Sequence, residues 1–584
     1  MVSYGELFRE ICRNVTKVPE ARGWCGEAGG EPVSIAGTGF RAAVIGGGKL
    51  RTLAFGLCLG VLGTAGAWGQ AGSCGQIAKV NLEHTTIVSA EEVAAGKLTP
   101  PDTGKPDAVY SKVPAFCRVV AESHPSSDSQ IKIEVWLPLH GWNGKFLGQG
   151  NGGFAGYIDY IGLSHAVRAG YASAGTDTGH TTQDALWALG HPEKMVDYGY
   201  RGIHEMTETG EAVTQAFYGK APDHRYFSSC SNGGREALME AQRFPEDYDG
   251  IVAGAPAYNW THLVSGGLAV SHKLFGDPAS YIPASKVHAI ATSVLAQCDK
   301  THQGFLDDPR TCQFDPGVLL CKGAENDACL TAPQVTALKG LYAGAQGADG
   351  KQIEPGYLPG AEEGPNGWGS WVFGESADKS VGAGFVDGYF KNMVYEKADL
   401  DVKALNLDEA LNAATEKTSQ ELDAVNPDLG PFRAHGGKLI LYHGWNDPAI
   451  PAVGTVDYYN EVVEKAGAEE ANGFVRLFVV PGLQHCGGGP GLNSFGQGWS
   501  GIDGKGADAD HSIVMAVEKW VETGTAPERV TGAHVEEKND KYKVTMTRPL
   551  CAYPKVAKYK GKGKRSEAGS WECGDGPRDE GRGT

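Results

Sequence analysis

The stretch that decides the fold is residues 226–234, which have the sequence YFSSCSNGG. Its aromatic start predicts the end of a strand, and residues 234–243, with apolar side chains at helical spacing, predict a helix. Between them lies Ser231, where a sharp turn from strand to helix leaves a serine hydroxyl exposed. The usual pattern G-x-S-x-G has Ser229 in place of its first glycine, a small change. Alone, the run fits a nucleophile elbow and an ordinary glycine-rich turn equally well.

Two cysteines connect this turn to a histidine far along the chain. Cys230 precedes Ser231, and Cys486 follows His485. If the two cysteines bond, their Cα atoms come within about 4.4–6.8 Å of each other. The serine and the histidine beside them are then as close as a nucleophile and its general base must be. The two dipeptides therefore predict a serine–histidine site.

An aspartate completes the expected site. Asp447 follows the predicted strand 439–442, and His485 follows the predicted strand 475–480. Both should lie at the carboxyl edge of one sheet, where α/β proteins place their catalytic groups. An aspartate there orients the imidazole and stabilises its charged form. His443 is the nearest competing histidine, but it has no cysteine beside it. The order serine, aspartate, histidine is also that of α/β-hydrolases.

Strand and helix patterns alternate along two parts of the chain. The first part has predicted strands over residues 131–137, 145–147, 171–174 and 251–253. After Pro256 the pattern stops, and the next residues are rich in loops and hold four cysteines. Strands return from residue 438, and a helix is predicted over residues 512–521. We therefore expect an α/β fold with a mostly parallel sheet in residues 71–255 and 431–584, and a lid inserted as residues 256–430.

The composition limits the classes of function. The 584 residues carry a net charge of −18, with a pI near 5.4, which disfavours nucleic acid and anionic membrane surfaces as partners. Apolar residues make up 41% and charged residues 21%, so the chain is globular rather than disordered. The expected partner is a small molecule, and the sequence carries no prediction of an oligomeric state.

Residues 1–70 have the pattern of a leader. Two basic residues precede the short apolar run 53–62, and small residues follow it, as in a secretory signal peptide. The run is shorter than the ~20 residues of a spanning helix, so no stable membrane anchor is expected. Because such peptides begin near the initiator, we expect residues 1–43 to be an upstream extension, with translation starting near Val44. The protein is therefore expected to be secreted or periplasmic.

The cysteine count agrees with export. Of the 13 cysteines, three lie in the leader, which leaves ten, an even number as in disulfide-bonded exported proteins. Their positions suggest the pairs Cys74–Cys117, Cys230–Cys486, Cys298–Cys312, Cys321–Cys329 and Cys551–Cys573. None of these is a C-x-x-C pair, so a zinc site is not indicated.

A glycine-rich loop follows the predicted strand 145–147. Residues 148–154 read GQGNGGF. Backbone N–H groups at Gly152 and Gly153, with that of Asn232 after the serine, are the expected donors of an oxyanion hole.

The same loop also supports a rival hypothesis. Gly148, Gly150 and Gly153 spell G-x-G-x-x-G, and Asp177 ends the next strand, where a dinucleotide-binding fold places a ribose-binding acid. An NAD-dependent oxidoreductase is therefore the alternative from another class of enzyme. It ranks lower because it leaves the two cysteines of the serine–histidine site unexplained.

Together these residues resemble the tannase and feruloyl esterase family. Cys230-Ser231, Asp447 and His485-Cys486 match its CS–D–HC motif, and the resemblance runs from about residue 74 to residue 575. Further matches are residues 177–180, 235–238, 245–250, 436–439 and 548–551. The resemblance implies an α/β-hydrolase core with an inserted lid. It also implies hydrolysis of esters of aromatic acids such as gallate, ferulate or terephthalate.

The resemblance assigns a role to each site residue. It implies Ser231 as the nucleophile, His485 as the general base and Asp447 as the residue that orients the base, with cleavage through an acyl-enzyme. Trp368 and Trp371 would wall the aromatic acyl pocket, although the core of the lid is an equally good place for them. A catalytically inactive relative that only binds its ligand is the third alternative.

The family's lid usually holds calcium in an aspartate-rich loop between two cysteines, here Cys298 and Cys312. Asp299 and Asp307 are the candidate ligands in this sequence. The loop is shorter than in the family and has Gln303 at the place of one aspartate, whereas calcium needs several oxygen ligands. We therefore expect no cofactor for catalysis and favour the absence of structural calcium.

Overall fold

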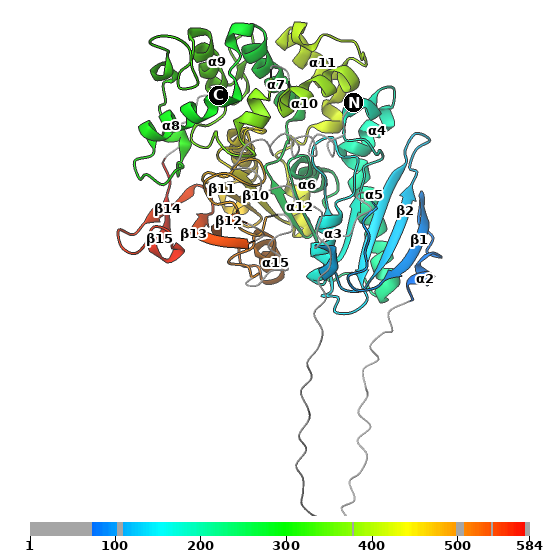
Figure 1. The fold of residues 1–584 in the computed structure, drawn as a ribbon. Coiled ribbons are helices and arrows are strands. Elements are labelled where there is room, and N and C mark those ends of the chain that lie inside the picture. Colours follow the sequence, from blue (N-terminus) through cyan, green and yellow to red (C-terminus); the bar gives the residue numbers. More distant parts are fainter. Residues whose placement is uncertain (1–72, 102–108, 377–378, 498–506, 539–540, 578–584) are drawn as a thin grey trace, which may run out of the picture. The chain divides into compact units, whose positions relative to one another are not determined.

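A mixed sheet of nine strands runs through the computed structural model (Figure 1). The structure describes residues 73–101, 109–376, 379–497, 507–538 and 541–577. In sheet order the strands are β1 (Thr85–Val93), β2 (Phe116–Ser123), β3 (Ile131–Pro138), β5 (Ala172–Thr176), β4 (Lys145–Gln149), β6 (His224–Cys230), β7 (Gly250–Gly254), β10 (Lys438–Gly444) and β11 (Val475–Val480).

The sheet has two parts with different pairing. From β1 through β2 and β3 to β5 the strands pair antiparallel, and from β5 to β11 they pair parallel. The parallel strands are short runs buried on both faces, such as β7, whose sequence GIVAG is wholly buried. The predicted parallel arrangement is confirmed for this part. The antiparallel edge of β1 and β2 was not predicted.

Helices cover both faces of the sheet. On one face lie α5 (Gly202–Tyr218), α6 (Asn232–Arg243) and α13 (Ala452–Ala466), and on the other α3 (Tyr160–Arg168) and α15 (Ile513–Thr523). Successive residues of a strand point to opposite faces, so Ile251 belongs to the first apolar core and Val252 to the second. The helices predicted over residues 234–243 and 512–521 correspond to α6 and α15.

A long insertion separates β7 from β10. Its elements are α7 (Trp260–Phe275), α8 (Val287–Cys298), α9 (Ala332–Ala343), β8 (Ala345–Gln346), β9 (Gln352–Glu354), α10 (Val381–Tyr389), α11 (Leu407–Leu422) and α12 (Gly430–His435). Figure 1 shows α7 to α11 gathered at one end of the sheet. One apolar cluster lies wholly within the insertion, and a second joins it to loops of the sheet domain. The insertion is therefore packed on the sheet domain, and residues 71–584 form one compact unit.

The last part of the chain adds two antiparallel strand pairs that the sequence did not predict. They are β12 (Arg529–Lys538) with β13 (Lys541–Cys551), and β14 (Lys555–Tyr559) with β15 (Trp571–Asp575). The structure contains every disulfide pair that the sequence suggested: Cys74–Cys117, Cys230–Cys486, Cys298–Cys312, Cys321–Cys329 and Cys551–Cys573.

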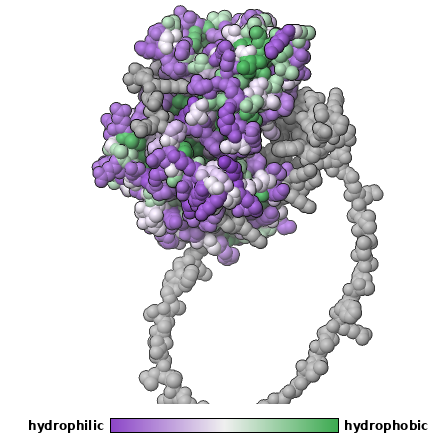
Figure 2. Space-filling model, turned by 90° about the vertical axis from the view of Figure 1, so that its left-hand side faces the viewer, coloured by the Kyte–Doolittle hydropathy of each residue, from purple (hydrophilic) through white to green (hydrophobic). Residues whose placement is uncertain are grey.

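The predicted leader, the helices and the surface of the protein bear on its expected export. The predicted leader, residues 1–70, lies outside the described residues. Among the described helices, none is both long enough and apolar enough to cross a bilayer. Figure 2 shows a face that is mostly hydrophilic, with hydrophobic residues in small separate groups. A chain in which 21% of residues are charged is expected to present such a surface.

Candidate active site

Ser231 occupies a sharp turn between β6 and α6. Its backbone has φ 68° and ψ −124°, a strained conformation for a residue with a side chain. Its N–H donates to the carbonyl of Gly254 at 2.9 Å, and its carbonyl accepts from the N–H of Ala257 at 3.2 Å. A Cβ atom at Gly234 would lie 2.2 Å from the Gly254 carbonyl oxygen, so the turn needs a glycine there. The neighbouring strand thus fixes the serine.

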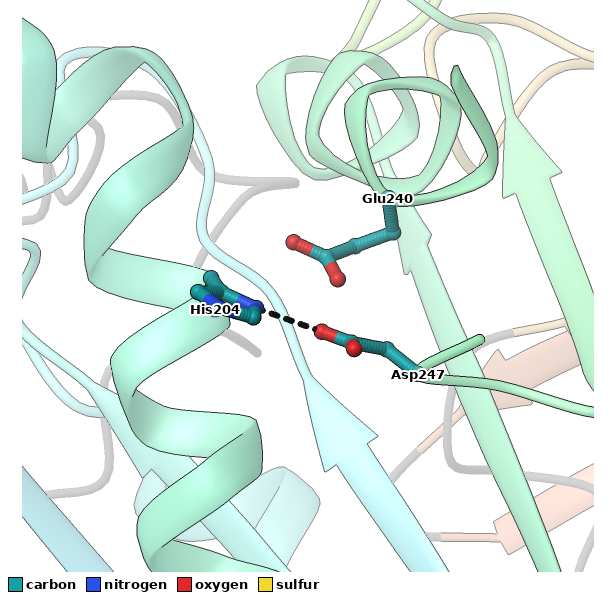
Figure 3. A group of neighbouring side chains, drawn as sticks. All are labelled: His204, Glu240 and Asp247. Atoms are coloured by element: carbon teal, nitrogen blue, oxygen red, sulfur yellow. Dashed lines mark hydrogen bonds and ion pairs between the residues drawn. The ribbon is translucent and has the colours of Figure 1, made fainter. Parts of the chain in front are cut away.

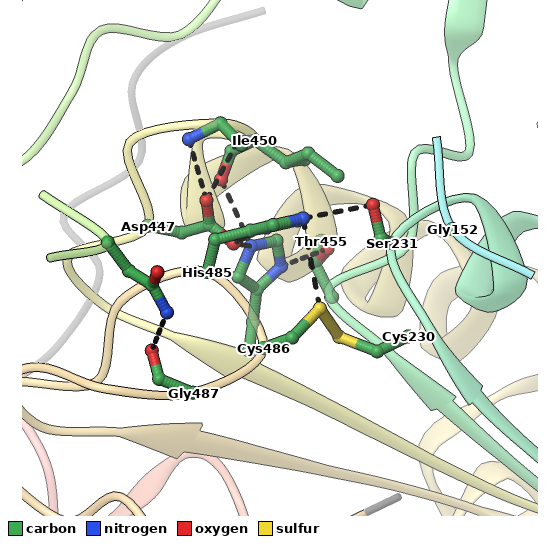
Figure 4. Close-up of a disulfide and its surroundings, with 12 residues drawn as sticks. Gly152, Cys230, Ser231, Asp447, Ile450, Thr455, His485, Cys486 and Gly487 are labelled. Atoms are coloured by element: carbon green, nitrogen blue, oxygen red, sulfur yellow. Dashed lines mark hydrogen bonds and ion pairs between the residues drawn. A yellow bond between two sulfur atoms is a disulfide. The ribbon is translucent and has the colours of Figure 1, made fainter. Parts of the chain in front are cut away.

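His485 and Asp447 stand in line with the serine hydroxyl (Figure 4). His485 Nε2 is 2.9 Å from Ser231 Oγ, and His485 Nδ1 is 2.8 Å from Asp447 Oδ2. Asp447 lies just past β10, and His485 lies in the loop after β11, which pairs with β10. The structure therefore brings together the three residues that the sequence singled out.

A disulfide ties the serine turn to the histidine loop. Cys230 and Cys486 are bonded with Cα atoms 6.1 Å apart, across 256 positions of sequence. Figure 4 shows the bond directly beside Ser231 and His485. Since each cysteine adjoins one of these residues, the bond limits how far the hydroxyl and the imidazole can separate.

The Asp447 side chain is fully buried, and both of its carboxylate oxygens accept hydrogen bonds. Its Oδ1 accepts the N–H groups of Ala449 at 2.8 Å and Ile450 at 2.9 Å. Its Oδ2 accepts from His485 and lies 3.2 Å from Nε2 of His443, a buried histidine. Burial alone would raise the pKa of Asp447, but the charge of His485 and hydrogen bonds from both histidines bring it below its usual value.

His443 belongs to the site, although the sequence indicated it only as a competitor of His485. Its Nδ1 is 2.8 Å from the Thr455 hydroxyl, and its Nε2 is 3.0 Å from the carbonyl oxygen of Ile450. The sequence signal was present, because His443 is the penultimate residue of β10 and Asp447 follows four residues later. It is a second neighbour of the aspartate rather than a competitor of His485.

The predicted oxyanion loop lies beside Ser231, and its two glycines differ. The N–H of Gly152 donates to the hydroxyl of Tyr157 at 2.9 Å. Gly153 and Asn232 line the same cavity as Ser231. The Gly152 N–H is therefore used within the loop, and Gly153 is the glycine of the pair that lines the cavity.

The buried side chain of Glu236 holds the glycine-rich loop in place. It accepts the N–H of Asn151 at 2.9 Å and the side-chain amide of Asn232 at 2.8 Å. Burial raises the pKa of Glu236 to about 7. The carboxyl thereby links the glycine-rich loop to the first residue of α6, so both halves of the expected oxyanion hole share one support.

A cavity of about 100 Å³ opens in front of the serine. Ser231 and His485 line it from the sheet domain, and Trp371 and Phe385 line it from the insertion. The Trp371 ring meets the His485 ring edge to face, with centroids 5.0 Å apart, and stacks on Phe385 at 6.3 Å. The position predicted for Trp371 agrees with this arrangement.

Trp368 does not line the cavity. Its side chain is 1% exposed and packs against Tyr342, Tyr357 and Phe373 inside the insertion. The prediction that it walls the acyl pocket is therefore corrected, because its ring belongs to the insertion's own core. The two neighbouring tryptophans point to different places, which spacing alone did not indicate.

Comparison with known proteins places the chain in a family. It matches the family described as "Tannase and feruloyl esterase" over residues 117–574. The chain belongs to that family. An uncharacterised esterase of Xanthomonas campestris is 42% identical over 556 residues, covering 91% of this chain and 95% of the relative.

Solved structures agree with this membership. The crystal structure of feruloyl esterase B from Aspergillus oryzae is 31% identical with a TM-score of 0.77, covering 86% of this chain and 99% of that chain. Tannin acyl hydrolase from Aspergillus niger shares the fold, with 22% identity and a TM-score of 0.65 over 84% of this chain and 92% of its own. This member of the tannase and feruloyl esterase family is accordingly a carboxylic ester hydrolase with an α/β-hydrolase fold.

The dinucleotide alternative is not favoured for this family member. A Cβ at Gly148 would lie 2.2 Å from the Tyr248 hydroxyl, and one at Gly150 would lie 2.5 Å from the Glu236 carboxyl. These glycines therefore serve internal packing. Asp177 is buried, and its Oδ1 accepts the N–H groups of Lys132 and Gly179, so it supports the backbone rather than presenting a ribose-binding acid.

The predicted calcium loop lies between Cys298 and Cys312. Asp299 Oδ1 accepts two hydrogen bonds from Thr301, and its Oδ2 accepts the N–H of Gly304 at 2.8 Å. Both oxygens of this candidate ligand are therefore engaged in the turn itself.

Arg548 engages two further side-chain oxygens of that loop. Its guanidinium is 2% exposed and donates to Asp307 Oδ1 at 2.6 Å and to Gln303 Oε1 at 2.7 Å. A buried cation beside these oxygens opposes a second, divalent one by repulsion. The residues present do not fit calcium, which corrects the assignment of Asp299 and Asp307 as candidate ligands.

A further group of side chains of the kinds that bind metals lies between α5, α6 and the segment before β7 (Figure 3). His204 on α5, Glu240 on α6 and Asp247 before β7 bring their ligand atoms within 4.8 Å of one another. His204 Nδ1 already pairs with Asp247 at 2.7 Å. Burial, with the nearby charge of Asp247, raises the pKa of Glu240 well above its usual value. The contact between His204 and Asp247 joins α5 to the segment before β7.

Proposed function

We propose that the chain is an exported serine carboxylesterase that hydrolyses esters of aromatic acids through an acyl-enzyme. The observation that carries this proposal is the continuous contact from Ser231 Oγ through His485 to Asp447, at 2.9 Å and 2.8 Å. Family membership supplies the ester chemistry. No other arrangement of hydroxyl, imidazole and carboxylate faces the cavity among the described residues.

The first half of the proposed reaction forms the acyl-enzyme. His485 Nε2 removes the proton of the Ser231 hydroxyl while Oγ attacks the ester carbonyl. The Nδ1–H of His485 donates to Asp447, which stabilises the imidazolium that results. The oxyanion accepts hydrogen bonds from the backbone N–H groups of Asn232 and Gly153. The intermediate then collapses, and His485 gives its proton to the departing alcohol.

The second half releases the acid. A water molecule gives a proton to His485 Nε2 and attacks the acyl carbonyl. The tetrahedral intermediate uses the same N–H donors and expels Ser231 Oγ, which takes the proton back from His485. In this scheme the reaction needs no cofactor, because each proton moves between His485, the serine, the alcohol and water.

The substrate class follows from the cavity wall. Trp371 and Phe385 offer aromatic surface next to His485, and the other lining residues are mostly aliphatic. Such a wall favours a flat aromatic acyl group. The solved relatives are named for feruloyl and tannin esters, which supports esters of ferulate, gallate or a similar acid. Residues 256–430 act as the lid in this proposal, since both aromatic residues belong to them.

Export is the remaining part of the proposal. The disulfides among the described residues and the signal-like pattern of residues 53–62 both suit a secreted or periplasmic protein. Determining the N-terminus of the protein recovered from its natural host tests this directly. Cleavage after the small residues near position 70 is expected, and an intact chain that starts at residue 1 would contradict export.

The catalytic proposal is tested with a panel of esters. Methyl ferulate, methyl gallate, a terephthalate monoester and p-nitrophenyl acetate are offered to the oxidised protein and to Ser231→Ala. Turnover of at least one aromatic ester is expected, with a loss on the order of 10⁴-fold or more in the variant. An aromatic ester hydrolysed equally well by Ser231→Ala would refute the mechanism.

A further inference from the structure

The insertion contributes an acidic side chain to the cavity that holds Ser231 and His485. Glu354, the last residue of β9, lines this cavity together with Tyr357. Most of the surrounding wall is apolar, with Leu263, Val264 and Val270 from α7 and Leu341 from α9. Two polar groups in such a wall are the usual means by which a pocket fixes the orientation of a ligand.

Neither polar side chain is used by the protein itself. The Glu354 carboxyl and the Tyr357 hydroxyl have no hydrogen-bond or ion-pair partner among residues 73–101, 109–376, 379–497, 507–538 and 541–577. Both residues are half-buried, and both face the cavity. Neither residue is among those whose unpartnered polar atoms are sealed inside the protein, so a molecule in the cavity can satisfy both groups.

The backbone around Glu354 is built to hold it there. A Cβ at Gly266 of α7 would lie 2.6 Å from Glu354 Cβ and 2.7 Å from its Cγ. The Cβ and Cγ atoms of Glu354 therefore pack directly against the backbone of α7. Gly344 has φ +81°, and a Cβ there would lie 2.4 Å from the Glu354 carbonyl oxygen. Glu354 also pairs with Ala345 in the small sheet of β8 and β9.

The electrostatic surroundings keep the carboxyl largely uncharged near pH 7. Burial, followed by the charge of Asp457 on α13, raises the pKa of Glu354 to about 8. The other titratable groups near it are Tyr258, Tyr357 and His262, whose Nδ1 is 3.0 Å from the carbonyl oxygen of Ile353. In this state Glu354 offers both an O–H donor and a carbonyl acceptor.

We propose that Glu354 and Tyr357 form a subsite that hydrogen-bonds a phenolic hydroxyl on the aromatic acyl group. A phenol both donates and accepts, which matches a carboxyl and a hydroxyl that face one cavity. An ester without this hydroxyl leaves both groups unpaired when it fills the cavity, and such sites discriminate strongly against the poorer ligand. The inference rests on the proposed esterase function and specifies its substrate class.

The test compares methyl 4-hydroxycinnamate with methyl cinnamate, which differ only in the phenolic hydroxyl. The wild-type protein is expected to favour the hydroxylated ester by about tenfold or more in kcat/KM. Glu354→Leu should bring the ratio close to one, mainly by slowing the hydroxylated ester. Glu354→Gln retains a donor and an acceptor and should keep most of the preference, and Tyr357→Phe should lower it in part.

Glu416→Leu is the matched control, because Glu416 is an exposed carboxyl on α11 of the same insertion. It should leave the ratio unchanged. An unchanged ratio in Glu354→Leu, or an equal loss for both esters in a folded variant, would overturn the subsite. If hydrolysis of methyl cinnamate does not depend on Ser231, the esterase mechanism itself fails, and the subsite fails with it.

Discussion

The two walls of the active-site cavity are built in opposite ways. On the wall from the sheet domain, Ser231, His485 and Asp447 are fixed by one another, by buried neighbours and by a disulfide. On the wall from the insertion, the Glu354 carboxyl and the Tyr357 hydroxyl have no hydrogen-bond or ion-pair partner among the described residues. This contrast assigns the reaction to the wall from the sheet domain and the choice of substrate to the wall from the insertion. Substitutions in the sheet-domain wall should therefore lower kcat, and substitutions in the insertion wall should change the preference between substrates.

The largest effect short of removing the triad is expected from the site disulfide. Cys230→Ala with Cys486→Ala should lower kcat by about 100-fold, because a displacement of about 1 Å between reacting groups costs that much. The melting temperature should change much less than the rate. Kinetics and thermal unfolding of the same preparation measure both.

The control for this prediction lies in the insertion. Cys321→Ala with Cys329→Ala also removes one disulfide. That disulfide joins residues 8 positions apart, and both are far from the triad in sequence. That variant should keep the kcat of the wild type. Equal losses of kcat in the two double variants would contradict a special role for the bond beside the serine.

The next effect concerns His443, which lies 3.2 Å from Asp447 Oδ2. His443→Gln should lower kcat by about tenfold, the equivalent of one hydrogen bond to a charged group, and leave KM nearly unchanged. It should also move the acid limb of the pH–rate profile, which a purely structural role would leave in place. His288→Gln, an exposed histidine of the insertion, is the control. A normal rate and profile in His443→Gln would show that Asp447 needs only His485.

A smaller effect is expected at the loop between Cys298 and Cys312. Excess EDTA should leave the melting temperature and the activity unchanged, because Arg548 already engages Asp307 and Gln303. Arg548→Met should destabilise the protein by about 2 kcal/mol, since it leaves acceptors of the loop unpaired. A fall in melting temperature with EDTA that calcium alone reverses would contradict this account.

The smallest effect is the pH dependence of stability from Glu240. Its pKa in the folded protein lies well above the unfolded value, so its contribution is fully present below the unfolded pKa and is lost as pH rises toward the folded one. Glu240→Gln should therefore gain stability relative to the wild type as the pH rises from 5 to 9. Urea unfolding of the wild type and of Glu240→Gln at pH 5 and pH 9 measures this difference. A larger gain at pH 5 than at pH 9 would contradict the prediction.

The sequence predicted the sheet domain better than the insertion, for physical reasons. Buried parallel strands are short apolar runs, so β7 and β10 were recognised, and residues that follow such strands meet at one edge, which located Asp447 and His485. Edge strands β1 and β2 alternate in burial and lacked that signal. Trp368 and Trp371 share one local pattern but reach different surroundings, and Glu354 has no motif, because its role depends on contacts between distant segments.

Covalent labelling shows directly whether Ser231 is the nucleophile. A p-nitrophenyl phosphonate ester is incubated with the oxidised protein, and the site of attachment is found by peptide mass mapping. We expect one phosphonyl group per chain, on Ser231, with release of one equivalent of nitrophenolate and very slow labelling of His485→Ala. Labelling at another residue, or equal labelling of the His485→Ala variant, would contradict this expectation.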